Sequence, residues 1–142
     1  METINNQNIQ VTYPSLSDRF QSTFIDTILI IILMFAISSI LENYENPPDW
    51  VRIVLFFGIF GVYEPVCTSL GCTLGNYIKN IRVRKHSDTT KRINLFQALI
   101  RYVFKFSLGW ISFLTMHTNK ERRAIHDFAA GSVMINHSKP GR

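Results

Sequence analysis

The sequence predicts an all-α membrane protein with two transmembrane helices, a third apolar segment and a basic amphipathic cytoplasmic segment. Residues 24–41 form an apolar run whose single charge is Asp26, and residues 51–67 form another that contains only Arg52 and Glu64. A helix needs about 20 apolar residues to cross a hydrocarbon core about 30 Å thick. A soluble helix keeps a polar face over this length, so an ordinary soluble enzyme is excluded.

The first helix is expected to be capped by Ser17 or Asp18 and to run to Leu41. A loop at residues 42–50 follows, and its two consecutive prolines prevent the helix from continuing. The second helix should cover residues 51–65 or a little more. These elements belong to one membrane domain.

The chain of 142 residues is long enough for one domain. We predict a polar N-terminal tail at residues 1–17, the membrane domain at residues 18–135 and a C-terminal tail at residues 136–142. No serine-hydrolase, nucleotide-binding or zinc-protease motif occurs, so we expect no enzymatic activity, no cofactor and no metal site.

Residues 72–91 are basic and alternate with apolar residues, which is typical of a segment that lies on an anionic membrane surface. Anionic lipid is therefore the expected partner rather than nucleic acid. The candidate ligands for lipid headgroups are Lys79, Arg82, Arg84 and Lys85.

The apolar segment at residues 94–116 permits two interpretations. It is long enough to span, but it contains Arg101 and Lys105 and is divided by Gly109. The loop before it carries six Lys and Arg against one Asp, whereas the loop at residues 42–50 is acidic, so the amino terminus should be cytoplasmic. A re-entrant or interfacial segment keeps every basic cluster on that side and is preferred over a third span.

Ionisable side chains within or beside the apolar segments are the candidate site. Asp26 and Glu64 are expected at similar depth, where Arg19, Arg101 and Lys105 could join them in one cluster. One interpretation is a proton or cation site, because charged residues at membrane depth are costly and mark ion pathways. The other is a structural network of ion pairs that holds the segments together.

Near the carboxyl end, at residues 123–127, we expect a surface ion pair rather than a functional site. Arg123 and Asp127 are four residues apart, which predicts an ion pair on the surface of a helix. His126 precedes Asp127 directly, but neighbouring residues of a helix point about 100° apart and do not form a dyad.

Several of these residues resemble the pattern of the RDD family of small membrane proteins. Arg19, Asp26 and Asp127 match the Arg-Asp-Asp residues that give the family its name. The segment at residues 71–75 is similar to the family's Gly-x-Thr-x-Gly-Lys motif through Gly71, Thr73 and Gly75. Further matches are Glu64, Arg101, the hydrophobic-Arg-Val motif at residues 81–83 and the C-terminal motif at residues 126–133. The sequence departs from the family pattern at two positions, where Asn76 replaces the usual Lys and Ser132 replaces the usual Thr.

The resemblance implies a multi-pass protein of the bacterial inner membrane that transports ions or small ligands. Our leading hypothesis is a homo-oligomer that exchanges a monovalent cation such as Na⁺ for H⁺. Asp26 would carry the ion, Arg19 and Arg101 would tune it, and Glu64 would be a second carboxylate. Asp127 would hold the terminal helix against the basic segment. The alternative is a non-transporting accessory or scaffold subunit that docks on a membrane-protein partner.

Overall fold

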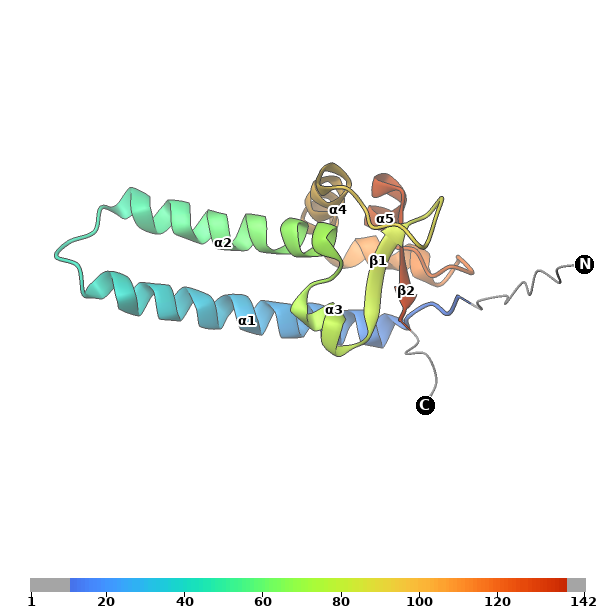
Figure 1. Ribbon diagram of the computed structural model, residues 1–142, viewed down its shortest axis with the longest axis horizontal. Helices are drawn as coiled ribbons and strands as arrows, with labels where there is room; N and C mark the ends of the chain where they lie inside the picture. Colours follow the sequence, from blue (N-terminus) through green and yellow to red (C-terminus); the bar gives the residue numbers. More distant parts are fainter. Residues whose placement is uncertain (1–10, 138–142) are drawn as a thin grey trace, which may run out of the picture.

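The computed structural model describes residues 11–137 and shows a long helical hairpin that projects from a compact end (Figure 1). The hairpin consists of α1 (Leu16–Glu42) and α2 (Asp49–Leu70). Many large apolar side chains along it are exposed, as a bilayer requires. The prediction of a mainly helical membrane protein is confirmed, since three helical stretches are long and apolar enough to span.

The cap of α1 differs from the prediction. Ser15, not Ser17 or Asp18, is the N-cap, and its side chain accepts a hydrogen bond from the amide of Asp18 at 3.1 Å. The Ser15 hydroxyl also donates to the Asp18 carboxylate at 2.7 Å, so Asp18 belongs to the first turn. The second helix continues past Pro65 and ends at Gly71, whose φ of 145° a side chain would disfavour.

The compact end contains all the remaining elements. In chain order they are α3 (Leu74–Ile78), β1 (Ile81–Lys85), α4 (Leu95–Leu108), the 3₁₀ helix η1 (Gly109–Met116), α5 (Ile125–Ala130) and β2 (Ser132–Asn136). The two strands pair antiparallel, with Val83 opposite Met134. Together with Ile81, Ile93 and Ala98, these two residues form the small hydrophobic core.

The basic amphipathic segment predicted at residues 72–91 contains two short elements. It contains the short α3 and then strand β1, in which Ile81 and Val83 are buried while Arg82 and Arg84 point the other way. Successive side chains of a strand alternate between its two faces, so the alternation of apolar and basic residues has a period of two.

The third apolar segment breaks at Gly109, as the sequence predicts. The helix α4 ends at Leu108, and Gly109, the first residue of η1, adopts a positive φ of 50°. Figure 1 shows α4 crossing the base of the hairpin rather than running along it. The inward face of α4 includes Ala98 and Arg101. Other apolar side chains of α4 are exposed, among them Leu95, Phe96, Leu99 and Val103.

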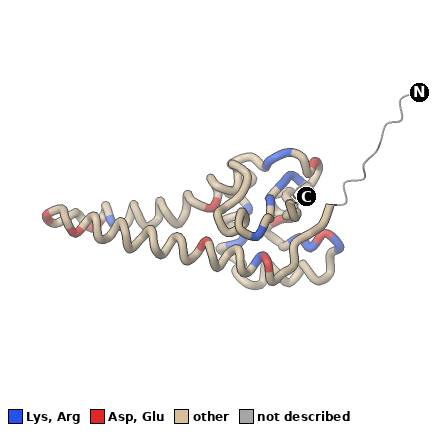
Figure 2. Tube along the Cα trace, turned by 60° about the horizontal axis from the view of Figure 1, so that its bottom comes forward, with Lys and Arg blue, Asp and Glu red and all other residues tan. Residues whose placement is uncertain are grey.

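Charges are strongly segregated along the molecule (Figure 2). The tip of the hairpin carries the acidic residues Glu42, Glu45 and Asp49. The shaft is nearly free of charge, and most Lys and Arg residues gather at the compact end. The molecule thus has an apolar middle between an acidic tip and a basic base.

Candidate functional site

Asp127 is the centre of a buried ionic cluster. Its side chain is fully buried, one oxygen accepts a hydrogen bond from Arg19, and the other accepts from Arg101 Nε at 2.9 Å. Asp127 also accepts from the amide of Ala124 at 3.1 Å, which fixes the first turn of α5. Burial opposes the charged form of Asp127, but the charges of Arg19 and Arg101 outweigh burial and hold the pKa of this carboxyl well below its ordinary value.

Two expectations for Asp127 are wrong. It does not form a surface pair with Arg123, whose guanidinium donates instead to the carbonyl oxygen of Ser132 at 3.0 Å and lies over the ring of Phe128. It also does not hold α5 against the basic segment, because its two arginine partners come from α1 and α4. Asp127 therefore fastens α5 to the start of the hairpin and to the crossing helix.

His126 is buried beside this cluster. Its Nδ1 shares a hydrogen bond with the Ser112 hydroxyl, and its Nε2 lies 3.6 Å from Asp127 Oδ1. Burial lowers the pKa of His126 to about 2, against the opposing charge of Asp127, so the ring is neutral near pH 7. Sequence reasoning missed the bond to Ser112, because the two residues lie 14 positions apart with no recognisable spacing.

Glu64 forms a second ionic group between α2 and α4. Lys105 Nζ donates to Glu64 Oε1 at 2.7 Å, and Arg101 Nη1 lies 3.9 Å from the same oxygen. Arg101 therefore connects Glu64 to the Asp127 cluster. The predicted meeting of Glu64, Arg101 and Lys105 is found in the structure.

Asp26 is held apart from these ionic groups. Its Oδ1 accepts from the Tyr63 hydroxyl at 3.0 Å and from the amide of Gly75 at 2.8 Å, and its Oδ2 accepts from the Thr73 hydroxyl at 2.6 Å. No Lys or Arg of residues 11–137 forms an ion pair with it. The expected single cluster therefore divides, and Arg19, two turns before Asp26, bonds Asp127 instead.

The Gly-x-Thr-x-Gly segment explains how Asp26 is positioned. Gly71 ends α2, and Thr73 caps α3 by accepting from the amide of Asn76. A Cβ at Gly75 would lie 2.0 Å from the backbone oxygen of Ser22, so only glycine lets α3 approach α1 this closely. Asn76, which replaces the usual lysine, is buried and accepts from the Ser22 hydroxyl at 2.6 Å.

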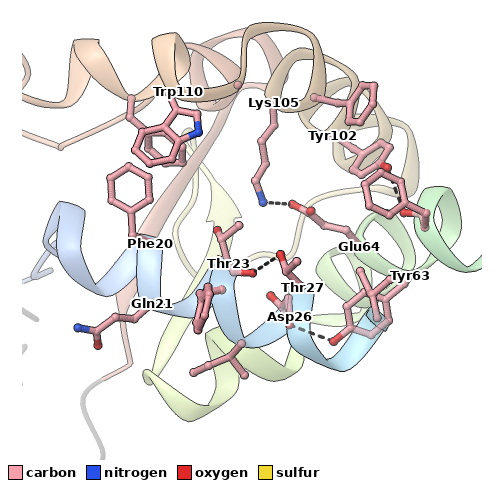
Figure 3. A pocket seen from close by; sticks show the side chains of 17 residues that line it. Phe20, Gln21, Thr23, Asp26, Thr27, Tyr63, Glu64, Tyr102, Lys105 and Trp110 are labelled. Atoms are coloured by element: carbon pink, nitrogen blue, oxygen red, sulfur yellow. Dashed lines mark hydrogen bonds and ion pairs between the residues drawn. The ribbon is translucent and has the colours of Figure 1, made fainter. Parts of the chain in front are cut away.

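A cavity of about 860 Å³ lies between α1, α2 and the α4–η1 segment (Figure 3). Asp26, Glu64 and Lys105 are its charged lining residues, so the lining carries one net negative charge. Most of the remaining wall is apolar or aromatic. Its aromatic residues are Phe20, Phe24, Phe60, Tyr63, Tyr102, Phe106, Trp110 and Phe113.

The four predicted headgroup ligands have different surroundings. Lys79 Nζ lies 3.4 Å from Asp18, and Arg82 donates to the sulfur of Cys72 at 3.0 Å. Arg84 Nη1 is buried without a hydrogen-bond partner among residues 11–137. Burial, followed by the charges of Arg92 and Arg82, lowers the pKa of Arg84. Lys85 bonds through its backbone amide to the loop before α4.

Comparison with known proteins identifies the family. The model of the RDD family matches residues 13–131, which is most of the chain and includes Asp26, Glu64 and Asp127. No curated protein and no solved structure matches the chain.

Proposed function

The chain belongs to the RDD family of membrane proteins, and from this premise we propose that it is the subunit of an oligomeric transporter that exchanges a monovalent cation for protons. The observation that carries the proposal is the placement of Asp26. Three hydrogen-bond donors fix its carboxylate at the wall of the 860 Å³ cavity, and no basic side chain of residues 11–137 neutralises it.

The charge of the cavity supports exchange rather than simple binding. An aspartate inside a membrane helix costs about 2.5–3.5 kcal/mol when it is charged at the centre of the bilayer. A proton or a monovalent cation can each neutralise Asp26, and they compete for the same carboxylate. Sodium and protons are the first species to compare.

The other charged residues have supporting roles in this proposal. Glu64 is the second carboxylate of the cavity and is already paired with Lys105. Arg101 tunes Glu64 from 3.9 Å while it also bonds Asp127. Arg19 does not line the cavity. It supports the cavity indirectly, because its ion pair with Asp127 holds the base of α1 against α5.

An oligomer is needed because the cavity is open on one side and three short helical stretches cannot enclose a pathway. The face of α2 that carries Gly58 and Gly61 supports close packing by another subunit, since a Cβ at either glycine would meet nothing within 4 Å. The same face is compatible with a non-transporting accessory subunit that docks on another membrane protein. Transport by the purified chain distinguishes these two candidates.

The pairing of β1 with β2 supports a two-span topology. These strands flank the third apolar segment, and hydrogen-bonded strands must lie on the same side of a bilayer. The α4–η1 segment would then enter and leave on one side with its exposed apolar face in lipid. We place both termini in the cytoplasm and the protein in the bacterial inner membrane, because the basic compact end belongs inside.

Cysteine labelling tests this topology. With Cys67 and Cys72 replaced by serine, a membrane-impermeant maleimide should label Glu45→Cys from outside whole cells. It should label Ser87→Cys and Lys120→Cys only after the membrane is opened. Labelling of Lys120→Cys in intact cells would mean that the third segment spans.

Anionic lipid is the proposed partner of the basic surface around β1. The orphaned Arg84 Nη1 beside Arg82 and Arg92 supports a site for a lipid phosphate. Binding of the protein to phosphatidylglycerol over phosphatidylcholine, measured by native mass spectrometry, should weaken in Arg84→Gln. An unchanged preference would remove this surface from the proposal.

Cation binding by the purified protein tests the proposed exchange. At an acidic pH that protonates Asp26, addition of NaCl or LiCl to weakly buffered protein in a sugar detergent should release protons, read by a pH dye. Asp26→Asn should abolish the release, whereas Asp49→Asn, the same change at the hairpin tip, should retain it. Equal proton release from both variants would exclude Asp26 as the exchange site.

A further inference from the structure

We infer that the cavity at Asp26 takes an organic monovalent cation, an ammonium or pyridinium that carries apolar groups, in preference to a bare metal ion. This inference rests on the proposed function and names its substrate class. It follows from the size of the cavity, from the aromatic residues of its wall and from the small number of free oxygen ligands around Asp26.

The size of the cavity suits an organic molecule. Sites for small organic ligands measure about 300–1,000 Å³ and are mostly apolar with a few placed polar groups. The cavity of about 860 Å³ lies within this range, and its lining is mainly apolar. A monovalent metal ion would leave nearly all of this space empty.

Aromatic rings line the end of the cavity opposite Tyr63. Phe20 lies 5.2 Å from the ring of Trp110 and 4.9 Å from that of Phe113, measured between centroids. Figure 3 shows the rings of Phe20 and Trp110 close together at this end. The face of an aromatic ring attracts a cation by about 0.5–2 kcal/mol, which suits a cation with apolar substituents.

The oxygens near Asp26 offer a poor shell for a metal ion. The two carboxylate oxygens already accept from Tyr63, Thr73 and Gly75. The backbone around Asp26 is regular helix, so its carbonyl oxygens are engaged within α1. Sodium sites in transporters use carbonyl oxygens of unwound helix, which α1 does not provide here.

One organic cation therefore satisfies both parts of the cavity. Its positive charge neutralises the net negative charge of the lining at Asp26, and its apolar groups lie among the aromatic rings. An uncharged molecule of the same shape would gain only the second contribution.

Fluorescence of Trp110 tests the inference in the full-length protein. The chain has two tryptophans, so Trp50→Phe leaves Trp110 as the only one. In micelles of a sugar detergent, 1-butylpyridinium should quench Trp110 with a saturable curve, and tetrabutylammonium should reverse the quenching. NaCl should reverse it only at a much higher concentration, because Na⁺ is the weaker competitor for the same carboxylate.

Three variants in the Trp50→Phe background test which residues bind the pyridinium. Asp26→Asn should weaken 1-butylpyridinium binding at least tenfold, and Asp49→Asn should not change it. Phe20→Leu should weaken it by about 2- to 30-fold through loss of the cation–aromatic contact. Because Phe20 makes no hydrogen bond, this variant keeps the test decisive if Asp26→Asn misfolds.

The inference fails if quenching is linear and does not saturate, or if NaCl displaces the pyridinium equally well. It also fails if saturable quenching survives in Asp26→Asn, because the cavity would then accept any apolar molecule, including a lipid chain. Proton release by NaCl without pyridinium binding would overturn this inference and leave the proposed exchange intact. Saturable, Asp26-dependent pyridinium binding without any transport would support the ligand class and refute the transporter.

Discussion

Removal of the Asp127 carboxylate should strongly destabilise the compact end. In Asp127→Ala, the guanidiniums of Arg19 and Arg101, which are 2% and 4% exposed, lose their shared anion. Arg101 keeps one anion, Glu64 at 3.9 Å, and Arg19 keeps neutral acceptors, the carbonyl oxygen of Arg122 at 3.1 Å and the sulfur atoms of Met116 and Met134. Breaking a buried ion pair on one side costs about 3–5 kcal/mol, so we expect a loss of this size.

The assay is unfolding of the protein in mixed micelles by a titration with a denaturing detergent, followed by circular dichroism. Asp127→Asn keeps the shape and one acceptor, and it should cost less, about 1.5–3 kcal/mol. Glu45→Ala, an exposed carboxylate at the tip of the hairpin, is the control and should leave the midpoint unchanged. A loss below about 1 kcal/mol in Asp127→Ala would refute the idea that this carboxylate joins α1, α4 and α5.

Three further predictions concern single residues. A Cβ at Gly75 would overlap a backbone oxygen of α1, so Gly75→Ala should cost about 1–3 kcal/mol or more in the same titration, whereas Gly58→Ala should not destabilise. His126 is neutral in the folded protein down to a pKa of about 2 but protonates near 6.5 when unfolded. Acid therefore favours unfolding, and stability should fall by about 1.4 kcal/mol between pH 7.5 and 5.5; a His126→Gln variant with the same slope would contradict this assignment. Lys105→Met leaves the Glu64 carboxylate without its 2.7 Å partner and should be less stable than the double variant with Glu64→Gln. If the double variant is no more stable than Lys105→Met, the pair does not stabilise the fold in this way.

The spanning helices could be predicted because their signal is local. An apolar run of about 18 residues needs no knowledge of the rest of the chain, and Gly109 marks the break in the third segment by itself. The Gly-x-Thr-x-Gly segment was also recognisable, although its role of holding Asp26 was not. That role depends on the approach of α3 to α1 within the folded protein.

The pairing of β1 with β2 could not be predicted from spacing, because 46 residues separate Lys85 from its partner Ser132. The alternation of Ile81, Arg82 and Val83 was a usable signal for a strand. It is short, however, and apolar and basic residues also alternate in surface helices.

The partners of Asp127 show the same limit more clearly. A spacing of four residues from Arg123 predicts a local ion pair. Nothing in that spacing reveals that Asp127 pairs instead with arginines from α1 and α4. Arg123 instead serves the backbone of β2. Long-range packing decided which charges meet, and local periodicity could not.

Flux through sealed liposomes is the most direct test of the proposed exchange. The purified chain is reconstituted with a trapped pH dye, and Na⁺, Li⁺ or an organic ammonium is added outside. We predict cation-dependent movement of protons that Asp26→Asn abolishes and Asp49→Asn retains. Absence of flux from correctly inserted, folded protein, or flux that survives in Asp26→Asn, would contradict the account.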